Sequence, residues 1–96
     1  MTAQAYKSLI KAFLNNTIDF DELETRFYAL DEQDQDMEEA LFLITDAAWG
    51  AIRCYWPNLP PQDETRTKIT KSTLRSELGQ AEARLDQYIQ AAAGAA

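Results

Sequence analysis

Apolar residues recur at helical spacing along the chain, and no segment alternates in the manner of a β-strand. The first run follows the i, i+3, i+4, i+7 pattern of one helical face: Tyr6, Leu9, Ile10, Phe13 and Leu14. The segment 15–17 should end this helix, because asparagine tolerates the left-handed backbone found at helix ends. A second helix is expected to start at Asp19, where Glu22 would complete a capping box. Its expected buried residues are Phe20, Leu23, Phe27 and Leu30.

A third helix is predicted from a cap at Asp36 to about Tyr55, where Pro57 prevents its continuation. One face of this segment carries Met37, Leu41, Ile44, Ala48, Ala51, Ile52 and Tyr55. Beside that face, aromatic residues recur every seven positions, at Phe42, Trp49 and Trp56. An apolar arc this wide predicts a central helix with two or three neighbours.

The remainder of the chain predicts a loop and a final helix. Residues 56–61 include three prolines and read as a surface loop, and the polar segment 62–71 suits a turn or short helix. A last helix is expected over 72–90, with inward residues Leu74, Leu78, Ala81, Leu85, Tyr88 and Ile89. The pattern therefore predicts an all-α antiparallel four-helix bundle, formed by a single domain over residues 1–90. Residues 91–96 are expected to be a disordered alanine-rich tail, because they offer little to bury.

The charge of the chain is concentrated in one region. The 96 residues carry a net charge of −7, yet residues 17–46 alone contain eleven acidic residues and one basic residue. The acidic block is centred on residues 31–39, between the second and third predicted helices. Such blocks are commonly only solvated, solubilising surface. This charge argues against direct binding of nucleic acid or of an anionic membrane, both of which require a cationic face.

Residue types needed for common catalytic and metal sites are scarce. The chain has no histidine, so the usual general base and the commonest transition-metal ligand are absent. The acidic block lacks the glycine and the final glutamate of a calcium-binding loop. The single cysteine, Cys54, is expected to be a small buried side chain, and it fits a reducing cytoplasm. We therefore expect a cytoplasmic protein that is no enzyme and that uses neither cofactor nor metal.

Recognition of a partner by a surface is the remaining class of function. A dense group of carboxylates suits a strongly cationic protein, and nuclease clefts are cationic because they hold phosphates. Near the end of the third helix, Trp56 is either an apolar anchor for a partner or a wall of the core. Within that helix, Asp46 either faces water or is positioned for a partner.

The segment 9–27, LIKAFLNNTIDFDELETRF, resembles the opening hairpin of colicin D-type immunity proteins. That hairpin has a helix ending in Phe-Leu, a turn of small residues, an isoleucine and a second helix with spaced aromatics. The segment 39–42, Glu-Ala-Leu-Phe, followed by Asp46 resembles the family's Glu-rich start of the third helix. The segment 74–85 is similar to its closing helix.

The resemblance implies a helical bundle that binds the C-terminal domain of a nuclease toxin and covers its cationic cleft. Such toxins commonly cleave transfer RNA, and contact-dependent inhibition systems use immunity proteins of the same kind. The family's acidic contacts would fall on Glu38, Glu39, Asp46, Asp63 and Glu64. With the acidic block and the aromatic residue, the expected toxin-binding set is Asp31, Glu32, Asp34, Asp36, Glu38, Glu39, Asp46, Trp56, Asp63 and Glu64. The alternative is a helical adaptor or regulatory subunit that docks a partner protein through the aromatic patch near Trp56.

Overall fold

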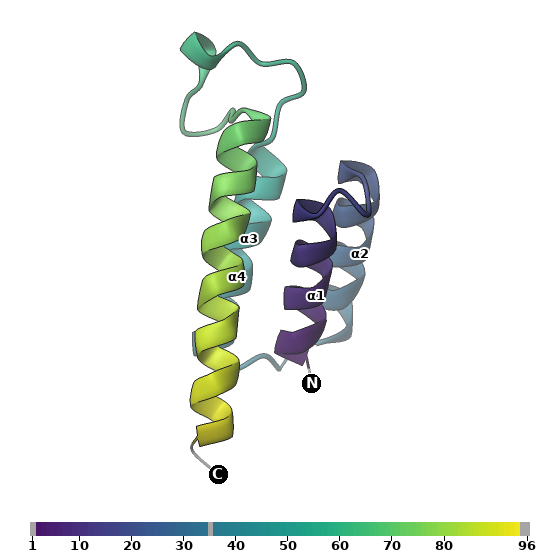
Figure 1. The fold of residues 1–96 in the computed structure, drawn as a ribbon, viewed down its shortest axis with the longest axis vertical. Helices are drawn as coiled ribbons and strands as arrows, with labels where there is room; N and C mark the ends of the chain where they lie inside the picture. Colours follow the sequence, from purple (N-terminus) through teal and green to yellow (C-terminus); the bar gives the residue numbers. More distant parts are fainter. Residues whose placement is uncertain (1, 35, 95–96) are drawn as a thin grey trace.

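The computed structural model describes residues 2–34 and 36–94 and forms four α-helices that run alternately up and down (Figure 1). The elements are α1 (Thr2–Leu14), α2 (Phe20–Gln33), α3 (Glu39–Cys54), the 3-10 turn η1 (Pro61–Asp63) and α4 (Lys71–Gly94). No strand forms within these two described ranges. The predicted all-α four-helix bundle is therefore confirmed.

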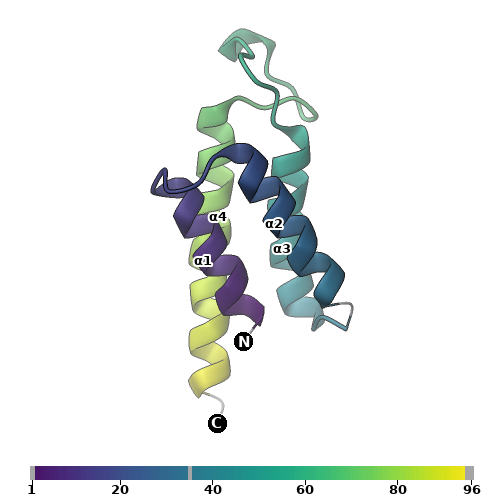
Figure 2. The same cartoon turned by 90° about the vertical axis from the view of Figure 1, so that its right-hand side faces the viewer.

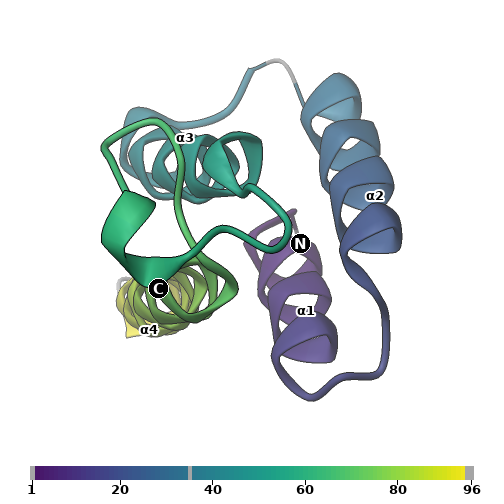
Figure 3. The same cartoon turned by 90° about the horizontal axis from the view of Figure 1, so that it is seen from above.

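The helices pack in the order α2, α1, α4, α3 around the bundle, which the view from above shows (Figure 3). The main helix contacts are α1 with α2, α1 with α4, and α3 with α4. Between α2 and α3 the contact is aromatic, with the Phe27 and Trp49 rings stacked 5.5 Å apart. The third helix thus packs against α4 and, through these rings, against α2, in agreement with the two or three neighbours that its apolar arc predicts.

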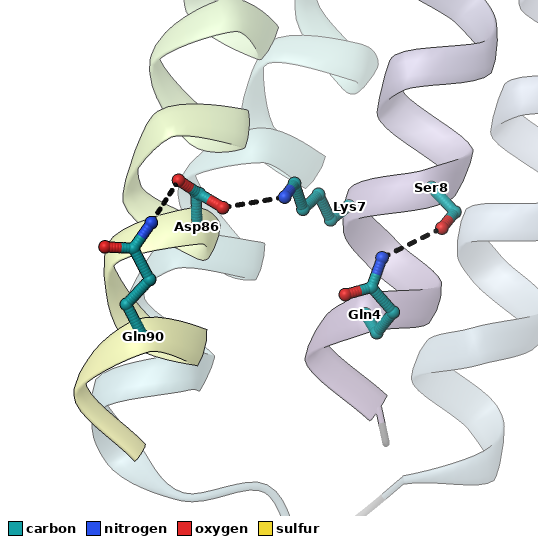
Figure 4. Close-up of polar contacts among 5 residues, drawn as sticks. All are labelled: Gln4, Lys7, Ser8, Asp86 and Gln90. Carbon is teal, nitrogen blue, oxygen red and sulfur yellow. Dashed lines mark hydrogen bonds and ion pairs between the residues drawn. The ribbon is translucent and has the colours of Figure 1, made fainter. Parts of the chain in front are cut away.

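The core lies on the helix faces that the apolar pattern marked. Its largest fully buried side chains are Tyr6, Phe27, Ile10, Leu23, Ile52, Leu74, Leu78 and Leu85. The seam between α1 and α4 also contains an ion pair, in which Lys7 Nζ lies 2.7 Å from Asp86 Oδ1 (Figure 4). On the same carboxylate, Gln90 Nε2 donates to Oδ2 at 2.8 Å. The Lys7–Asp86 pair thus links α1 to α4, and Gln90 orients the Asp86 carboxylate from within α4.

The turn between α1 and α2 forms as the sequence predicts. Asn16 has a φ of 62°, the left-handed conformation that asparagine tolerates. The amides of Asn16 and Thr17 donate back to the carbonyls of Phe13 and Ala12, which satisfies two groups at the helix end. Asp19 then caps α2 by accepting a hydrogen bond from the Glu22 amide at 2.9 Å. The hairpin of α1 and α2 therefore determines the position of the C-terminal end of α2.

The connection between α2 and α3 is shorter than the acidic block centred on residues 31–39. Helix α2 continues through Gln33 with Asp34 as its C-cap, so Asp31 and Glu32 are helical. Neither glycine nor proline interrupts residues 31–39, and glutamate and glutamine propagate a helix well. The predicted cap at Asp36 was wrong, since the N-cap of α3 is Glu38, whose side chain makes no capping hydrogen bond.

The connection from α3 to α4 is a long strap that extends beyond the end of the bundle (Figure 2). It contains a turn at Asn58, whose φ is 62°, and the short helix expected within the polar segment. Its two ends pair where the Trp56 amide donates to the Ile69 carbonyl at 3.1 Å. Cys54 is half-buried beneath the strap, so it is less enclosed than predicted.

The last helix begins one residue before the expected start and ends at Gly94, beyond the expected end at Gln90. Alanine is the strongest helix former, which explains the added turn. The side chains of residues 91–94 are exposed, so nothing in the bundle holds them. That residues 91–96 form a disordered tail stays a prediction, and part of that range lies outside the described residues.

Candidate functional site

The acidic residues of the second connection gather at the lower end of the bundle (Figures 1 and 2). We call this group the acidic end, and its described members are Asp31, Glu32, Asp34, Asp36, Glu38 and Glu39. The first three belong to the last turn and C-cap of α2, and the last two flank the start of α3. The side chain of Gln35 lies outside the described residues.

In the folded chain, Asp46 of α3 lies near residues of the acidic end that are distant from it in sequence. A pocket of about 320 Å³ between α2 and α3, here called the acidic pocket, is lined by Asp31, Asp34, Met37, Phe42, Thr45, Asp46 and Trp49. Three carboxylates and two aromatic side chains therefore surround one hollow. Asp46 is exposed as well as facing the pocket, so its placement is compatible with both interpretations that the sequence allowed.

The carboxylates of the acidic pocket form no ion pair within the described ranges, and a basic group near the pocket is Arg53, whose guanidinium lies 5.9 Å from the centroid of the Trp49 ring. Across residues 2–34 and 36–94 the ion pairs are Lys7 with Asp86 and Arg26 with Glu22, and neither reaches the pocket. The last turn of α2 contains no basic residue either. Negative charge at a helix C-terminus is unfavourable, because the last carbonyls already carry partial negative charge. The acids at the C-terminus of α2 therefore oppose the stability of the free protein, whereas Glu38 and Glu39 lie at the N-terminus of α3, where negative charge is favourable.

One pocket carboxylate is fixed from the core by Tyr6. The Tyr6 side chain is fully buried in α1, and its hydroxyl donates to Asp31 Oδ1 at 2.5 Å. Its ring lies 5.0 Å from that of Phe27, which stacks on the pocket residue Trp49. Burial raises the pKa of Tyr6 far above its usual range, and the hydrogen bond to Asp31 raises it further. The hydroxyl thus stays a donor and orients the carboxylate without neutralising it.

Tyrosines also contact carboxylates elsewhere at the acidic end. The Tyr88 hydroxyl of α4 donates to Glu38 Oε2 at 2.7 Å, and this bond raises the pKa of Tyr88. A hydrogen bond to Glu32 likewise raises the pKa of Tyr28. Residues Thr2 and Ala3 of α1 join Tyr88 and Glu38 around a second hollow of about 200 Å³. Sequence reasoning placed Tyr6 and Tyr88 only in the core, although a buried tyrosine hydroxyl requires a partner.

The remaining predicted site residues lie at the opposite end of the bundle, on the strap (Figure 1). Trp56 is 52% exposed, and Lys68 Nζ lies 4.4 Å from its ring centroid. The interpretation of Trp56 as core wall was therefore wrong. Glu64 accepts from the Thr70 amide at 2.8 Å and from the Thr70 hydroxyl, which lowers the pKa of Glu64. Asp63 is exposed in η1, so the structure does not bring these three residues to the acidic end.

The comparison with protein families decides the class of protein. The family model described as bacterial self-protective colicin-like immunity matches residues 1–85, which include the whole acidic end and the strap. The chain belongs to this family. No curated protein and no solved structure matches it.

A member of this family is a self-protective immunity protein, and its partner is a toxin protein. Within the described ranges, no group of three or more Cys, Asp or Glu side chains is arranged to hold a metal ion. In the same part of the immunity protein, no helix has the length and apolar character required to cross a membrane. The acidic pocket combines aromatic walls with carboxylates that form no ion pair in the described ranges.

Proposed function

We propose that this immunity protein neutralises a nuclease toxin, one that cleaves transfer RNA, by placing the acidic pocket on the toxin's cationic active-site cleft. The observation that carries the proposal is the convergence of Asp31, Asp34 and Asp46 on one hollow, where none of them forms an ion pair with a described residue. The protection is stoichiometric and noncatalytic. It acts in the cytoplasm, in a colicin D-type or contact-dependent inhibition system.

The chemistry of a nuclease cleft explains why carboxylates suit it. Such a cleft holds phosphates with lysine and arginine side chains, so a rigid group of carboxylates meets a complementary potential there. Tyr6 holds Asp31 in place before binding, which reduces the ordering that complex formation requires. Complementary fields raise association rate constants to about 10⁸–10⁹ M⁻¹s⁻¹ at low salt, against about 10⁵–10⁶ M⁻¹s⁻¹ without steering.

The first test measures association with the C-terminal domain of the toxin encoded directly upstream, by stopped-flow fluorescence over a salt series. Asp34→Lys should lower the association rate constant about tenfold at low salt, because it reverses charge inside the acidic pocket. Asp63→Lys is the matched control, since it makes the same change in the exposed strap at the other end of the bundle. Equal effects of the two variants, or association that is insensitive to salt, would contradict the proposal.

The second test asks what the toxin does when it is bound. One equivalent of immunity protein should abolish cleavage of transfer RNA by the isolated toxin domain, and excess immunity protein should add nothing. Cleavage that continues in a stable complex would show that the active site is open and that the acidic pocket lies elsewhere. The adaptor alternative is tested in the same assays by Trp56→Ala, which should leave association and inhibition unchanged.

A further inference from the structure

The outer side of α3 is unusually apolar for a helix at the surface. Its exposed residues, here called the outer face of α3, are Glu39, Ala40, Phe42, Leu43, Asp46, Ala47, Gly50 and Arg53. Phe42 is 50% exposed and Leu43 is 61% exposed, which places both among the four large hydrophobic residues with exposed side chains in residues 2–34 and 36–94. A surface helix normally presents polar residues to water, and a helix apolar on all sides is normally buried.

The other long helix of the bundle shows what a solvated outer side looks like here. Between its start and Gln90, the exposed residues of α4 are Lys71, Ser72, Ser76, Glu77, Gln80, Ala83, Arg84, Gln87 and Gln90. All but one of them are polar. Compared with α4, α3 therefore exposes two large apolar side chains, Phe42 and Leu43, where α4 exposes none up to Gln90. This difference indicates that the outer face of α3 has a partner of its own.

The outer face is continuous with the acidic pocket. Phe42 belongs to both, because it is half-exposed on α3 and also lines the pocket beside Asp46. A partner whose cations reach Asp31 and Asp34 therefore also covers Phe42. Leu43 follows it in sequence and, with Ala40 and Ala47, forms an apolar strip at i, i+3 and i+7 spacing.

From this continuity we infer that the toxin covers the outer face of α3, with Leu43 and Phe42 as the apolar anchors of the complex. The inference rests on the proposed function and adds the desolvated centre that charge alone does not supply. A second copy of this chain is the less suitable occupant. Each copy has a net charge of −7, and a twofold contact centred on this helix would place Asp46 opposite Asp46. A cationic toxin surface meets the same acids with opposite charge.

The acids and the anchors should act on different rate constants. Long-range steering by the acidic pocket sets association, whereas apolar anchors that lose water only in the complex set dissociation. Leu43→Ala should therefore raise the dissociation rate constant of the toxin complex about 10- to 100-fold with the association rate constant unchanged. Ala47→Gln, which adds bulk on the same strip, should also speed dissociation. Ala83→Gln is the matched control, since it makes the same change at an exposed alanine of α4.

Surface plasmon resonance with the immobilised toxin domain measures both rate constants, and light scattering measures the oligomeric state. Each variant is accepted only if its thermal unfolding matches that of the parent, which we expect because Leu43 is exposed. Unchanged dissociation for both Leu43→Ala and Ala47→Gln, with salt-dependent association intact, would overturn the anchor assignment and leave the proposed function standing. A dimer that Leu43→Ala makes monomeric, with toxin dissociation unchanged, would assign the face to self-association instead. Salt-insensitive association of the parent protein would count against the proposed function itself.

Discussion

The hydrogen bond from Tyr6 to Asp31 gives the sharpest single test of the site's construction. Replacing Tyr6 by phenylalanine removes the hydroxyl and keeps the ring that packs 5.0 Å from Phe27, so no large cavity forms. A hydrogen bond to a charged group contributes about 1.5–3 kcal/mol. Because Asp31 is only half-buried, water can replace part of the lost bond. We expect Tyr6→Phe to lower the free energy of unfolding by about 1–2 kcal/mol, or the melting temperature by roughly 5–15 °C.

The same bond predicts that the stability of the parent protein and that of Tyr6→Phe depend differently on pH in alkaline solution. In the unfolded chain the tyrosine hydroxyl loses its proton near its ordinary pKa of 10.0, whereas burial and Asp31 raise the pKa of Tyr6 in the folded protein. Above pH 10 the unfolded state therefore binds fewer protons than the folded state, and stability falls as the pH rises. The parent protein should lose more stability than Tyr6→Phe between about pH 9.5 and 11. The difference between their free energies of unfolding should therefore become smaller as the pH rises.

Urea unfolding followed by tryptophan fluorescence at pH 7, 9.5, 10.5 and 11 measures both effects. Tyr88→Phe is the matched control, because it removes a similar bond to a carboxylate in an exposed setting. Its loss should be clearly smaller than that of Tyr6→Phe. A cost of Tyr6→Phe below about 0.5 kcal/mol would refute the reasoning, since a buried bond to a charge contributes more. Parallel pH curves for Tyr6→Phe and the parent protein would refute it too.

Substitutions at three further positions test other parts of the molecule. Glu32→Lys should stabilise the free protein by about 0.3–1 kcal/mol at low salt, because it places a cation at the C-terminus of α2. In stopped flow the same variant should bind toxin more slowly, and a destabilised variant would contradict this account of the acidic end. Asn16→Ala should cost about 1–2 kcal/mol in thermal unfolding because its φ is 62°, whereas Asn16→Gly should be nearly neutral. Phe27→Ala should cost about 3–5 kcal/mol by urea unfolding, since the ring is fully buried between Tyr6 and Trp49. A loss below about 1 kcal/mol for Phe27→Ala would contradict its central place in the core.

The helices and their first turn could be predicted from the sequence because local chemistry determines them. Asn16 follows the end of α1 and Asp19 caps α2, and each acts on backbone groups only a few residues away in the chain. Leu74, Leu78 and Leu85 recur at helical spacing, and this spacing alone predicts that they are buried. Local reasoning failed at the second connection, where Asp31 and Glu32 extend α2 although their charge disfavours that end of a helix.

The composition of the site could not be predicted, because it depends on which helices become neighbours. Asp46 joins Asp31 only because α3 lies across from α2, and Tyr6 reaches the same carboxylate from α1. The apolar arc of α3 predicted burial by neighbouring helices, whereas the bundle leaves Phe42 exposed. Periodicity counts apolar positions but does not distinguish a helix covered by its own chain from one covered by a partner.

The hollow formed by Thr2, Ala3, Glu38 and Tyr88 has a practical consequence for experiments on this protein. Both ends of the described chain lie on the same side of the bundle as the acidic end (Figure 1). A purification tag or a surface tether attached at either end would therefore sit beside the carboxylates and compete for them. The strap around Asn58 and Gln62 lies at the far end and is exposed, so it is the position at which a dye or an anchoring group leaves the acidic surface free.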